Sequence, residues 1–245
     1  MGEKPSDRRS VEKYLRREDT MLAKALHGVC SLRGGEYRNS SFKYGLELAI
    51  VLPALTVAIP VSAILGVAAK LEDGGSMFFV QERVGKDGKP LSVAKIRTMK
   101  PGSETAVSFL EHHGKFESGE DPRNTRIGRL VRASDLDELP QLLKVVTGEM
   151  SLIDVRCVDK VAIDRLRQLR PETFEEWYQA YIAGTPGIVN LYSAASQGIK
   201  FSTKKHHYDM LYAKKAKLGM DLFILYKTSQ RIYRRIKAKL VASRT

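Results

Sequence analysis

Cysteine is scarce in this chain of 245 residues, and its two cysteines, Cys30 and Cys157, lie far apart with no Cys-x-x-Cys pair. This scarcity excludes a disulfide-stapled scaffold and a structural zinc ribbon, and it favours a reducing compartment. Internal repeats and low-complexity tracts are also missing, which excludes collagen-like and disordered classes. The length suffices for one domain of full size with a buried core.

Acidic side chains are too few to balance the basic ones. The chain holds 41 Lys and Arg against 28 Asp and Glu, a formal net charge of +13. This charge favours an anionic partner, and nucleic acid, a lipid surface or a phosphorylated substrate would each qualify. Because the basic stretches lack the aromatic-rich or groove-entering elements of nucleic-acid binders, no nucleic acid is expected as a partner.

One long uncharged run stands out in this charged sequence. Residues 48–69 are 22 residues without a charge, enough for a helix to cover a hydrocarbon core of roughly 30 Å. Pro53 and Pro60 each bend such a helix, and their spacing of nearly two turns makes the bends add. The flanks are both basic, net +4 over residues 1–43 and net +10 over residues 70–245. Two basic sides favour a re-entrant, monotopic helix, with a single span or a buried soluble helix as alternatives.

The sequence divides into three predicted parts. Residues 1–41 form a polar extension, residues 42–70 hold the membrane helix, and residues 71–245 alternate short apolar runs with helical patterns. This alternation predicts a compact α/β or α+β domain. Residues 222–241 at its end predict a basic amphipathic helix, suited either to an anionic membrane surface or to an ordinary solvated face.

A β-hairpin is predicted over residues 78–99, with its turn at Asp87-Gly88. Lys95 and Arg97 are two residues apart on the second strand, so they project from one face. Neighbouring cations of this kind suit a shared anion, although a solvated face is the plainer explanation of the pair taken alone.

Four arginines recur at every third residue after the hairpin and would crowd one side of a helix or turn: Arg123, Arg126, Arg129 and Arg132. Arginine binds phosphate oxygens through a planar fork. The arginine ladder therefore suits a diphosphate ligand.

Asp137 and Glu138 lie just before Pro140. Because proline is tolerated in the first turn, a helix is predicted to begin just before it, with Asp137 near the N-cap. An ordinary capping aspartate explains this pattern in isolation. The same geometry also suits chemistry, because a helix N-terminus attracts phosphate and keeps a carboxylate ionised for attack on phosphorus. Glu138 could then help to hold a divalent cation.

Together these motifs resemble the bacterial sugar transferases, the monotopic phosphoglycosyl transferases that prime glycan assembly. The resemblance runs from about Phe42 to Thr228 and rests on the apolar helix and on FFVQERVGKDGK, KIRTM, DPRNTRIGRLVR, LDELPQL and GEMSL. It implies a re-entrant helix kinked at Pro60 that anchors a catalytic domain on the cytoplasmic face of the bacterial inner membrane. It also implies Mg²⁺-dependent transfer of a phospho-sugar from a UDP-sugar to polyprenyl (undecaprenyl) phosphate, through a covalent aspartyl intermediate with release of UMP.

The resemblance assigns roles residue by residue. Asp137 would be the nucleophile and Glu138 its partner, and both would hold the magnesium ion. Substrate or phosphate binding would fall to a set spread along the chain: Lys95, Arg97, Arg132, Arg156, Asp209 and Asp221. Contacts with downstream glycosyltransferases and a homodimer are left open.

Two loops depart from the family pattern. MSLIDVRC stands where the family usually has M-S-L-V-G-P-R-P, so Asp154 is expected to bring a negative charge into the phosphate pocket. In PGIVNLYSAASQG, Asn190 replaces a glycine and Gln197 replaces an arginine that contacts the nucleotide, and Asp135 replaces Ser or Thr beside the dyad. The nucleophile is kept while the donor pocket changes. Either the nucleotide sugar is unusual, or the protein is a weak or inactive relative that acts as a membrane-bound scaffold.

Other reactive side chains carry less weight. The histidine pairs at 112–113 and 206–207 have diverging side chains and are not expected to bind metal. Cys157 is expected to fill space rather than to act as a nucleophile. Trp177 and Tyr178 are expected to pack in the domain or to anchor it at a membrane interface.

Overall fold

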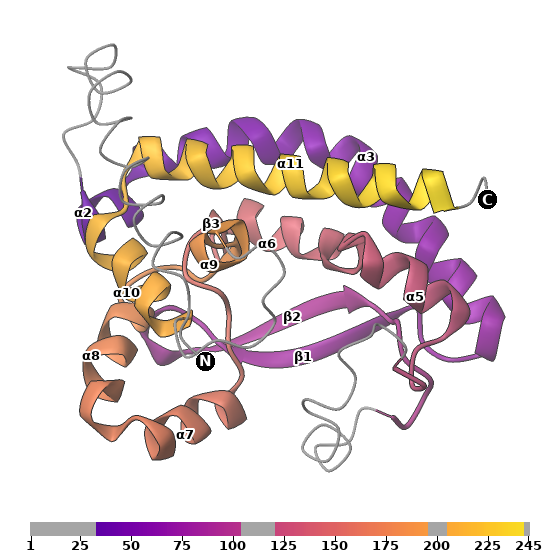
Figure 1. Ribbon diagram of the computed structural model, residues 1–245, viewed down its shortest axis with the longest axis horizontal. Coiled ribbons are helices and arrows are strands. Elements are labelled where there is room, and N and C mark those ends of the chain that lie inside the picture. The colour runs from indigo at the N-terminus through magenta and orange to yellow at the C-terminus, as the bar shows by residue number, and fades with distance from the viewer. Residues whose placement is uncertain (1–32, 104–120, 196–204, 243–245) are drawn as a thin grey trace.

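The computed structural model describes residues 33–103, 121–195 and 205–242. It is a mixed helix and strand fold, as expected, with two small sheets among many helices (Figure 1). The elements are, in order, α2 (Gly34–Arg38), α3 (Ser41–Asp73), β1 (Phe78–Val84), η1 (Lys86–Gly88), β2 (Pro90–Ile96), α5 (Arg126–Ala133), η2 (Leu136–Gln141), α6 (Leu142–Val146), β3 (Ser151–Ile153), α7 (Lys160–Leu169), α8 (Pro171–Ile182), β4 (Gly187–Val189), α9 (Leu191–Ala195), α10 (Lys205–Lys215) and α11 (Leu218–Ala242).

Helix α3 contains the long uncharged run. The Ser40 side chain caps its start by accepting a hydrogen bond from the Lys43 N–H, and Gly74, with φ 74°, ends it. One stripe of side chains at every third or fourth position is buried against the domain, whereas apolar residues such as Val57 and Ile64 are exposed. The helix is long and apolar enough to cross a membrane. Its exposed apolar surface indicates membrane association.

Helix α3 changes direction along its length. Figure 1 shows it running across the top of the view and then turning down toward α5, which it contacts. Pro53 and Pro60 both lie inside the helix, where each removes one backbone hydrogen bond and favours a bend. The kink at Pro60 and the re-entrant course through a membrane remain predictions.

The predicted hairpin is confirmed. β1 and β2 pair antiparallel, and Asp87 and Gly88 in the turn have φ values of 57° and 72°. Leu91 and Val93 on β2 are buried, while Lys95, further along the same face, reaches the end of the strand. Because β2 packs against η2, the hairpin supports the segment that carries Asp137 and Glu138.

The second sheet pairs β3 with β4 in parallel and lies in the hydrophobic core. Trp177 of α8 is buried there and stacks on Tyr181, with ring centroids 5.2 Å apart, which confirms its packing role. Helix α11 confirms the helix expected over residues 222–241. It buries Phe223 and Ile224 and exposes Tyr226 and Tyr233. Its binding to a membrane surface remains a prediction.

Residues 33–41 are the part of the predicted polar extension that the structure describes, and they belong to the folded core. The Gly34 N–H donates to the carbonyl oxygen of Ala216 at 2.9 Å, and Tyr37 is only 1% exposed. A side chain at Gly34 would collide with the backbone of Lys214, and its φ of +56° also favours glycine. The division of the chain at residues 41 and 70 remains a prediction.

Candidate active site

The two candidate catalytic carboxylates lie in the short 3₁₀ helix η2. Asp135 precedes this helix in the left-handed conformation, with φ 57° and ψ 18°. The helix begins at Leu136, earlier than the predicted start just before Pro140, and its N-cap is Asp135, so Asp137 lies in the first turn, two residues after the cap. The start was misjudged because Pro140 was expected in the first turn of the helix. Pro140 instead lies near the end of a short 3₁₀ helix that begins at Leu136.

Glu138 is the better compensated of the two carboxylates. Lys95 Nζ donates to Glu138 Oε1 at 2.6 Å, and Arg156 Nη2 lies 3.6 Å from the same oxygen. Burial acts to raise the pKa of Glu138, but the positive charges of Lys95 and Arg156 outweigh it and hold the pKa below its ordinary value. Glu138 is therefore ionised at neutral pH.

Asp137 has the opposite electrostatic environment. It is 9% exposed, and burial together with the neighbouring charge of Glu138 raises its pKa, against the lowering influence of Lys95 and Arg132. The helix N-terminus was expected to keep this carboxylate ionised; burial opposes that effect and is the largest influence on the pKa of Asp137, so its ionised state remains a prediction. Adjacent carboxylates thus have pKa values shifted in opposite directions.

We call Asp137, Glu138, Lys95, Arg132 and Arg156 the dyad cluster. Arg132 Nη1 donates to Asn124 Oδ1 at 3.0 Å, and its charge lowers the pKa of both Asp137 and Asp121. The cluster is assembled from β2, α5, η2 and the loop after β3. These five residues lie near one another, and their catalytic roles remain predictions.

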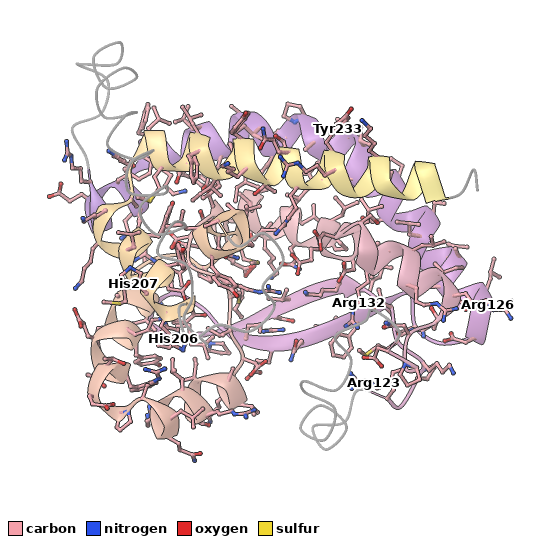
Figure 2. All side chains as sticks on the ribbon, viewed as in Figure 1. Arg123, Arg126, Arg132, His206, His207 and Tyr233 are labelled. Carbon is pink, nitrogen blue, oxygen red and sulfur yellow. The ribbon has the colours of Figure 1, made fainter. Side chains whose placement is uncertain are left out.

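The arginine ladder does not form one continuous face. Thr125 caps α5, so Arg123 precedes the helix and pairs with Asp121 at 2.6 Å. Figure 2 shows Arg123, Arg126 and Arg132 spread apart, with Arg126 at the outer end of the molecule. The expectation of four arginines on one side was wrong because the helix covers only the last three.

Arg97 lies away from the dyad cluster. Its guanidinium binds Asp73 at 2.5 and 2.7 Å and donates to the carbonyl oxygens of Ser76, Met99 and Ala69. Arg97 is 2% exposed, and it follows the last residue of β2. These contacts fasten the end of α3 to the hairpin. Lys95 and Arg97 therefore have different carboxylate partners instead of a shared anion.

Asp209 and Asp221 are buried, Asp209 beside α8 and Asp221 beside the start of α3. Asp209 accepts a hydrogen bond from Trp177 Nε1 at 3.3 Å. Asp221 accepts hydrogen bonds from the hydroxyls of Tyr37 and Tyr212 at 2.9 and 2.7 Å and lies 3.2 Å from Lys43 Nζ. Burial raises the pKa of Asp221 to about 6, despite the charge of Lys43. Their contacts are those of residues that hold the fold together.

The divergent loop after β3 turns its new charge inward. Asp154 is 1% exposed and is bound by Arg38, with Nη2 to Oδ1 at 2.6 Å and Nε to both oxygens at 3.0 and 3.1 Å. The expectation that Asp154 places a negative charge in the phosphate pocket was wrong, because this buried pair neutralises it. Arg156, two residues further on, is the side chain that reaches Glu138.

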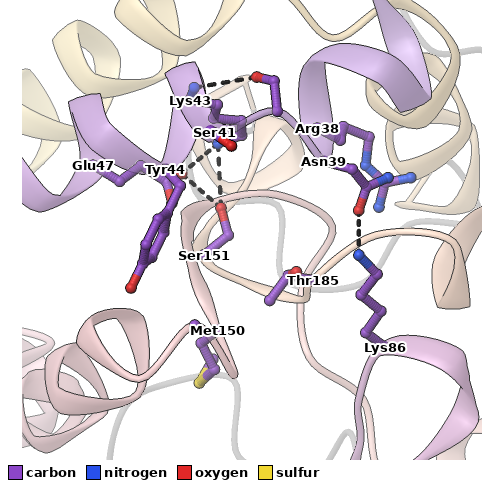
Figure 3. Close-up of a pocket in the computed structure, with 12 residues that line it drawn as sticks. Arg38, Asn39, Ser41, Lys43, Tyr44, Glu47, Lys86, Met150, Ser151 and Thr185 are labelled. Carbon is purple, nitrogen blue, oxygen red and sulfur yellow. Dashed lines mark hydrogen bonds and ion pairs between the residues drawn. The ribbon is translucent and has the colours of Figure 1, made fainter.

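A second group of charges, the inner charge cluster, comprises Arg38, Lys43, Glu47, Asp154 and Asp221. Lys43 Nζ pairs with Glu47 and donates to the carbonyl oxygen of Ile153 at 2.8 Å. A cavity of about 230 Å³ lies beside this cluster at the start of α3 (Figure 3). The cations that line the cavity bond to neighbouring residues; Lys86, for example, donates to Asn39 Oδ1. No member of the dyad cluster lines the cavity.

The remaining candidates are Cys157 and the two histidine pairs. Burial raises the pKa of Cys157 to about 11, which fits a space-filling thiol. His206 packs edge-on against Trp177, and no group of three potential metal ligands occurs within residues 33–103, 121–195 and 205–242. His112, His113 and Gln197 lie outside the described residues.

From the sequence we did not identify three charged residues that the structure places in the two charge clusters or beside them. Arg83 lies 3.4 Å from Asp159, and its charge helps to lower the pKa of Glu138. It shares a strand face with Lys95 through the hairpin register, a signal that could have identified it. Arg38 and Arg231 reach their partners, Asp154 and Asp135, across long sequence separations, and no local pattern indicates them.

Comparison with known proteins agrees with the motif set. The chain is similar to the UDP-N-acetylgalactosamine-undecaprenyl-phosphate N-acetylgalactosaminephosphotransferase of Aeromonas hydrophila, with 30% identity over 78% of this chain and 43% of the relative. It is 29% identical to the UDP-glucose:undecaprenyl-phosphate glucose-1-phosphate transferase of Escherichia coli K12, over 78% of this chain and 40% of the relative. The exopolysaccharide production protein ExoY of Sinorhizobium fredii is 28% identical over 76% of this chain and 83% of its own length.

The chain thus spans less than half the length of the first two of these relatives. The sequence model of one family, described as bacterial sugar transferase, matches residues 38–235. This match includes the long apolar helix, the hairpin, the dyad cluster and most of α11. The chain therefore belongs to the bacterial sugar transferase family.

Proposed function

We propose that this protein transfers a phospho-sugar from a nucleotide sugar, in particular a UDP-sugar, to polyprenyl phosphate, and so primes the assembly of a bacterial polysaccharide or glycoconjugate. The observation that carries the proposal is the pair of adjacent carboxylates in η2 with oppositely shifted pKa values. Opposite shifts in one site allow neighbouring groups to take different catalytic roles. Relatives named for sugar-phosphate transfer to undecaprenyl phosphate support the same acceptor.

Asp137 is the nucleophile in this proposal. An oxygen of its ionised carboxylate attacks the sugar-bearing phosphorus of the donor, the bond from that phosphorus to the bridging oxygen breaks, and the electron pair leaves with UMP. An oxygen of polyprenyl phosphate then attacks the same phosphorus, and the bond to Asp137 breaks. Lys95, Arg132 and Arg156 offset the negative charge that gathers around the dyad turn, by which we mean the first turn of η2 with Asp137 and Glu138.

The carboxylates of Asp137 and Glu138 also suit magnesium. Mg²⁺ prefers oxygen ligands and is commonly bound by one or two carboxylates, with substrate phosphates and waters as its other ligands. Two adjacent carboxylates fit that donor set, and among the described residues no third His, Cys, Asp or Glu is grouped with them. A bound Mg²⁺ would screen the repulsion between the attacking carboxylate and the diphosphate. Asp137 and Glu138 would hold it, and burial of Asp137 makes a nearby cation favourable.

The proposed location is the cytoplasmic face of the bacterial inner membrane, with α3 as a re-entrant helix. The exposed apolar surface of α3 and the basic flanks on both sides support this topology. Labelling of single cysteines placed near residues 36 and 87 tests it in spheroplasts. The same side is expected for both, and opposite sides would replace the re-entrant helix by a full span.

The structure gives less support to the alternative, an inactive membrane-bound scaffold, than the sequences of the altered loops did. The alternative was based on two altered loops, MSLIDVRC and PGIVNLYSAASQG. In the first, Asp154 is buried and paired with Arg38, and the second lies partly outside the described residues. Glu138, Lys95 and Arg156 keep mutual contacts in the presence of the altered loop. The departure therefore leaves the charges of the dyad cluster intact.

Release of UMP by the purified protein in nanodiscs tests the function. The assay contains undecaprenyl phosphate, Mg²⁺ and a panel of UDP-sugars. One sugar is expected to give UMP, and Asp137→Asn is expected to lower the rate by about 10³-fold or more. Asp164→Asn on α7 is the matched control, because this exposed aspartate lies outside the dyad cluster. No UMP from any sugar, with folded protein in the nanodisc, would contradict the proposal.

A further inference from the structure

The residue that introduces the dyad turn has an uncommon backbone conformation. Asp135, two residues before Asp137, lies in the left-handed region with φ 57° and ψ 18°. Residues other than glycine seldom adopt this backbone conformation, and aspartate tolerates it better than most. Such conformations persist where surrounding contacts hold them, and they concentrate at functional sites. The contacts of Asp135 therefore bear on the position of Asp137.

One of these contacts comes from the C-terminal helix. Arg231 Nη2 of α11 lies 3.5 Å from Asp135 Oδ2, and Arg231 Nη1 donates to the carbonyl oxygen of Ser193 at 2.9 Å. Ser193 belongs to α9, directly after β4. A planar guanidinium can hold two acceptors in a fixed relation, which an ammonium group cannot do as rigidly. Arg231 thus joins α11, α9 and the start of the dyad turn.

The two sides of α11 have different surroundings at this point. Tyr233 is 65% exposed and lies on the side of α11 turned away from the hairpin (Figure 2). Arg231 is two residues earlier, about 200° around the helix, and its guanidinium reaches inward. A side chain on the inner face of α11 therefore contacts Asp135, the residue that precedes η2.

We propose that Arg231 and Asp135 are positioning residues that fix the orientation of Asp137 and Glu138. Arg231 holds the carboxylate of Asp135, and Asp135 sets the left-handed residue from which η2 starts. This inference rests on the proposed function for its kinetic consequence. Its structural consequence, the ordering of η2, is independent of activity.

The kinetic test compares Arg231→Gln with Arg234→Gln in the UMP-release assay. Arg234 is an exposed arginine on the same helix, so both variants lose one positive charge from α11. Arg231→Gln is expected to lower kcat roughly 10-fold and to leave the donor KM within about twofold, because a misplaced nucleophile slows the chemical step. Arg234→Gln is expected to match the wild type. A raised donor KM with unchanged kcat would instead make Arg231 a binding residue and overturn the proposal.

Hydrogen–deuterium exchange of the same proteins gives the second readout. Faster exchange of the peptide covering Leu136–Gln141 is expected in Arg231→Gln and in Asp135→Asn, and not in Arg234→Gln. The double variant is expected to match Arg231→Gln, since that variant already removes the pair with Asp135. Unchanged exchange in Arg231→Gln would overturn the positioning role even if the wild type proved inactive. An inactive wild type with increased exchange in this variant would contradict the proposed function alone.

Discussion

The dyad cluster and the inner charge cluster are built from the same kinds of side chain but in different balance. In the inner charge cluster, Lys43 and Arg38 are almost fully buried and each contacts a carboxylate and a backbone carbonyl. In the dyad cluster, Lys95 and Arg156 are partly exposed and both favour Glu138, so burial of Asp137 is less compensated. Removing one partner from a fully paired buried cluster is costly, whereas incomplete compensation leaves a group with a shifted pKa that is able to react.

The inner charge cluster is expected to show the larger effect on stability. Lys43→Met would leave the carboxylates of Glu47 and Asp221 buried without their cation, and the free energy of unfolding should fall by about 3–5 kcal/mol. Thermal unfolding in detergent should show a midpoint roughly 10 °C lower. Lys70→Met, at an exposed position near the end of the same helix, is the control. A drop equal to that of the control would remove the distinction between the clusters.

The dyad cluster is expected to show the larger effect on activity. Glu138→Gln removes the charge that Lys95 and Arg156 compensate, and kcat for UMP release should fall by about 10² to 10⁴-fold. Its pair with Lys95 is partly exposed, so the free energy of unfolding should change by no more than about 1 kcal/mol. Steady-state kinetics and thermal unfolding of one preparation measure both. Severe destabilisation would show that Glu138 belongs with the structural charges.

Much of this arrangement was predictable from the sequence, and the wrong predictions share one physical cause. The hairpin follows from local turn chemistry and alternation, and the apolar run predicted α3. The motifs placed Lys95, Arg156 and Glu138 in one candidate site, and the structure brings these three side chains into contact through Glu138. Side chains whose partner lies far away in sequence were misjudged, because Arg97 meets Asp73 and Asp154 meets Arg38 only after the fold forms. Residue type and spacing cannot say which of several carboxylates an arginine will bind.

Asp137 should reduce stability at neutral pH. Its pKa is raised above the ordinary value near 4, so the stability linked to its protonated form is fully present below that value and is lost as pH rises through the shifted pKa. Asp137→Asn should therefore unfold roughly 2–4 °C higher than wild type at pH 7, with a smaller gain near pH 4. Unfolding midpoints across this pH range measure the difference. A variant less stable than wild type at pH 7 would show that Asp137 is held by compensating contacts and would weaken the contrast with the inner charge cluster.

Substitution of Cys157 is expected to have the smallest effect. It tests whether this residue of the altered loop takes part in the reaction. Its thiol is 8% exposed, and burial raises its pKa to about 11, so it is protonated at neutral pH and unsuited to act as a nucleophile. Cys157→Ala in a Cys30→Ser background should keep kcat within about twofold, since a small buried group is lost and the charges of the dyad cluster are unchanged. Iodoacetamide labelling of the Cys30→Ser protein should likewise be slow until the protein unfolds. Rapid labelling with loss of activity would mean that the loop carrying Arg156 opens to solvent, and that the position of Arg156 beside Glu138 depends on how this loop packs.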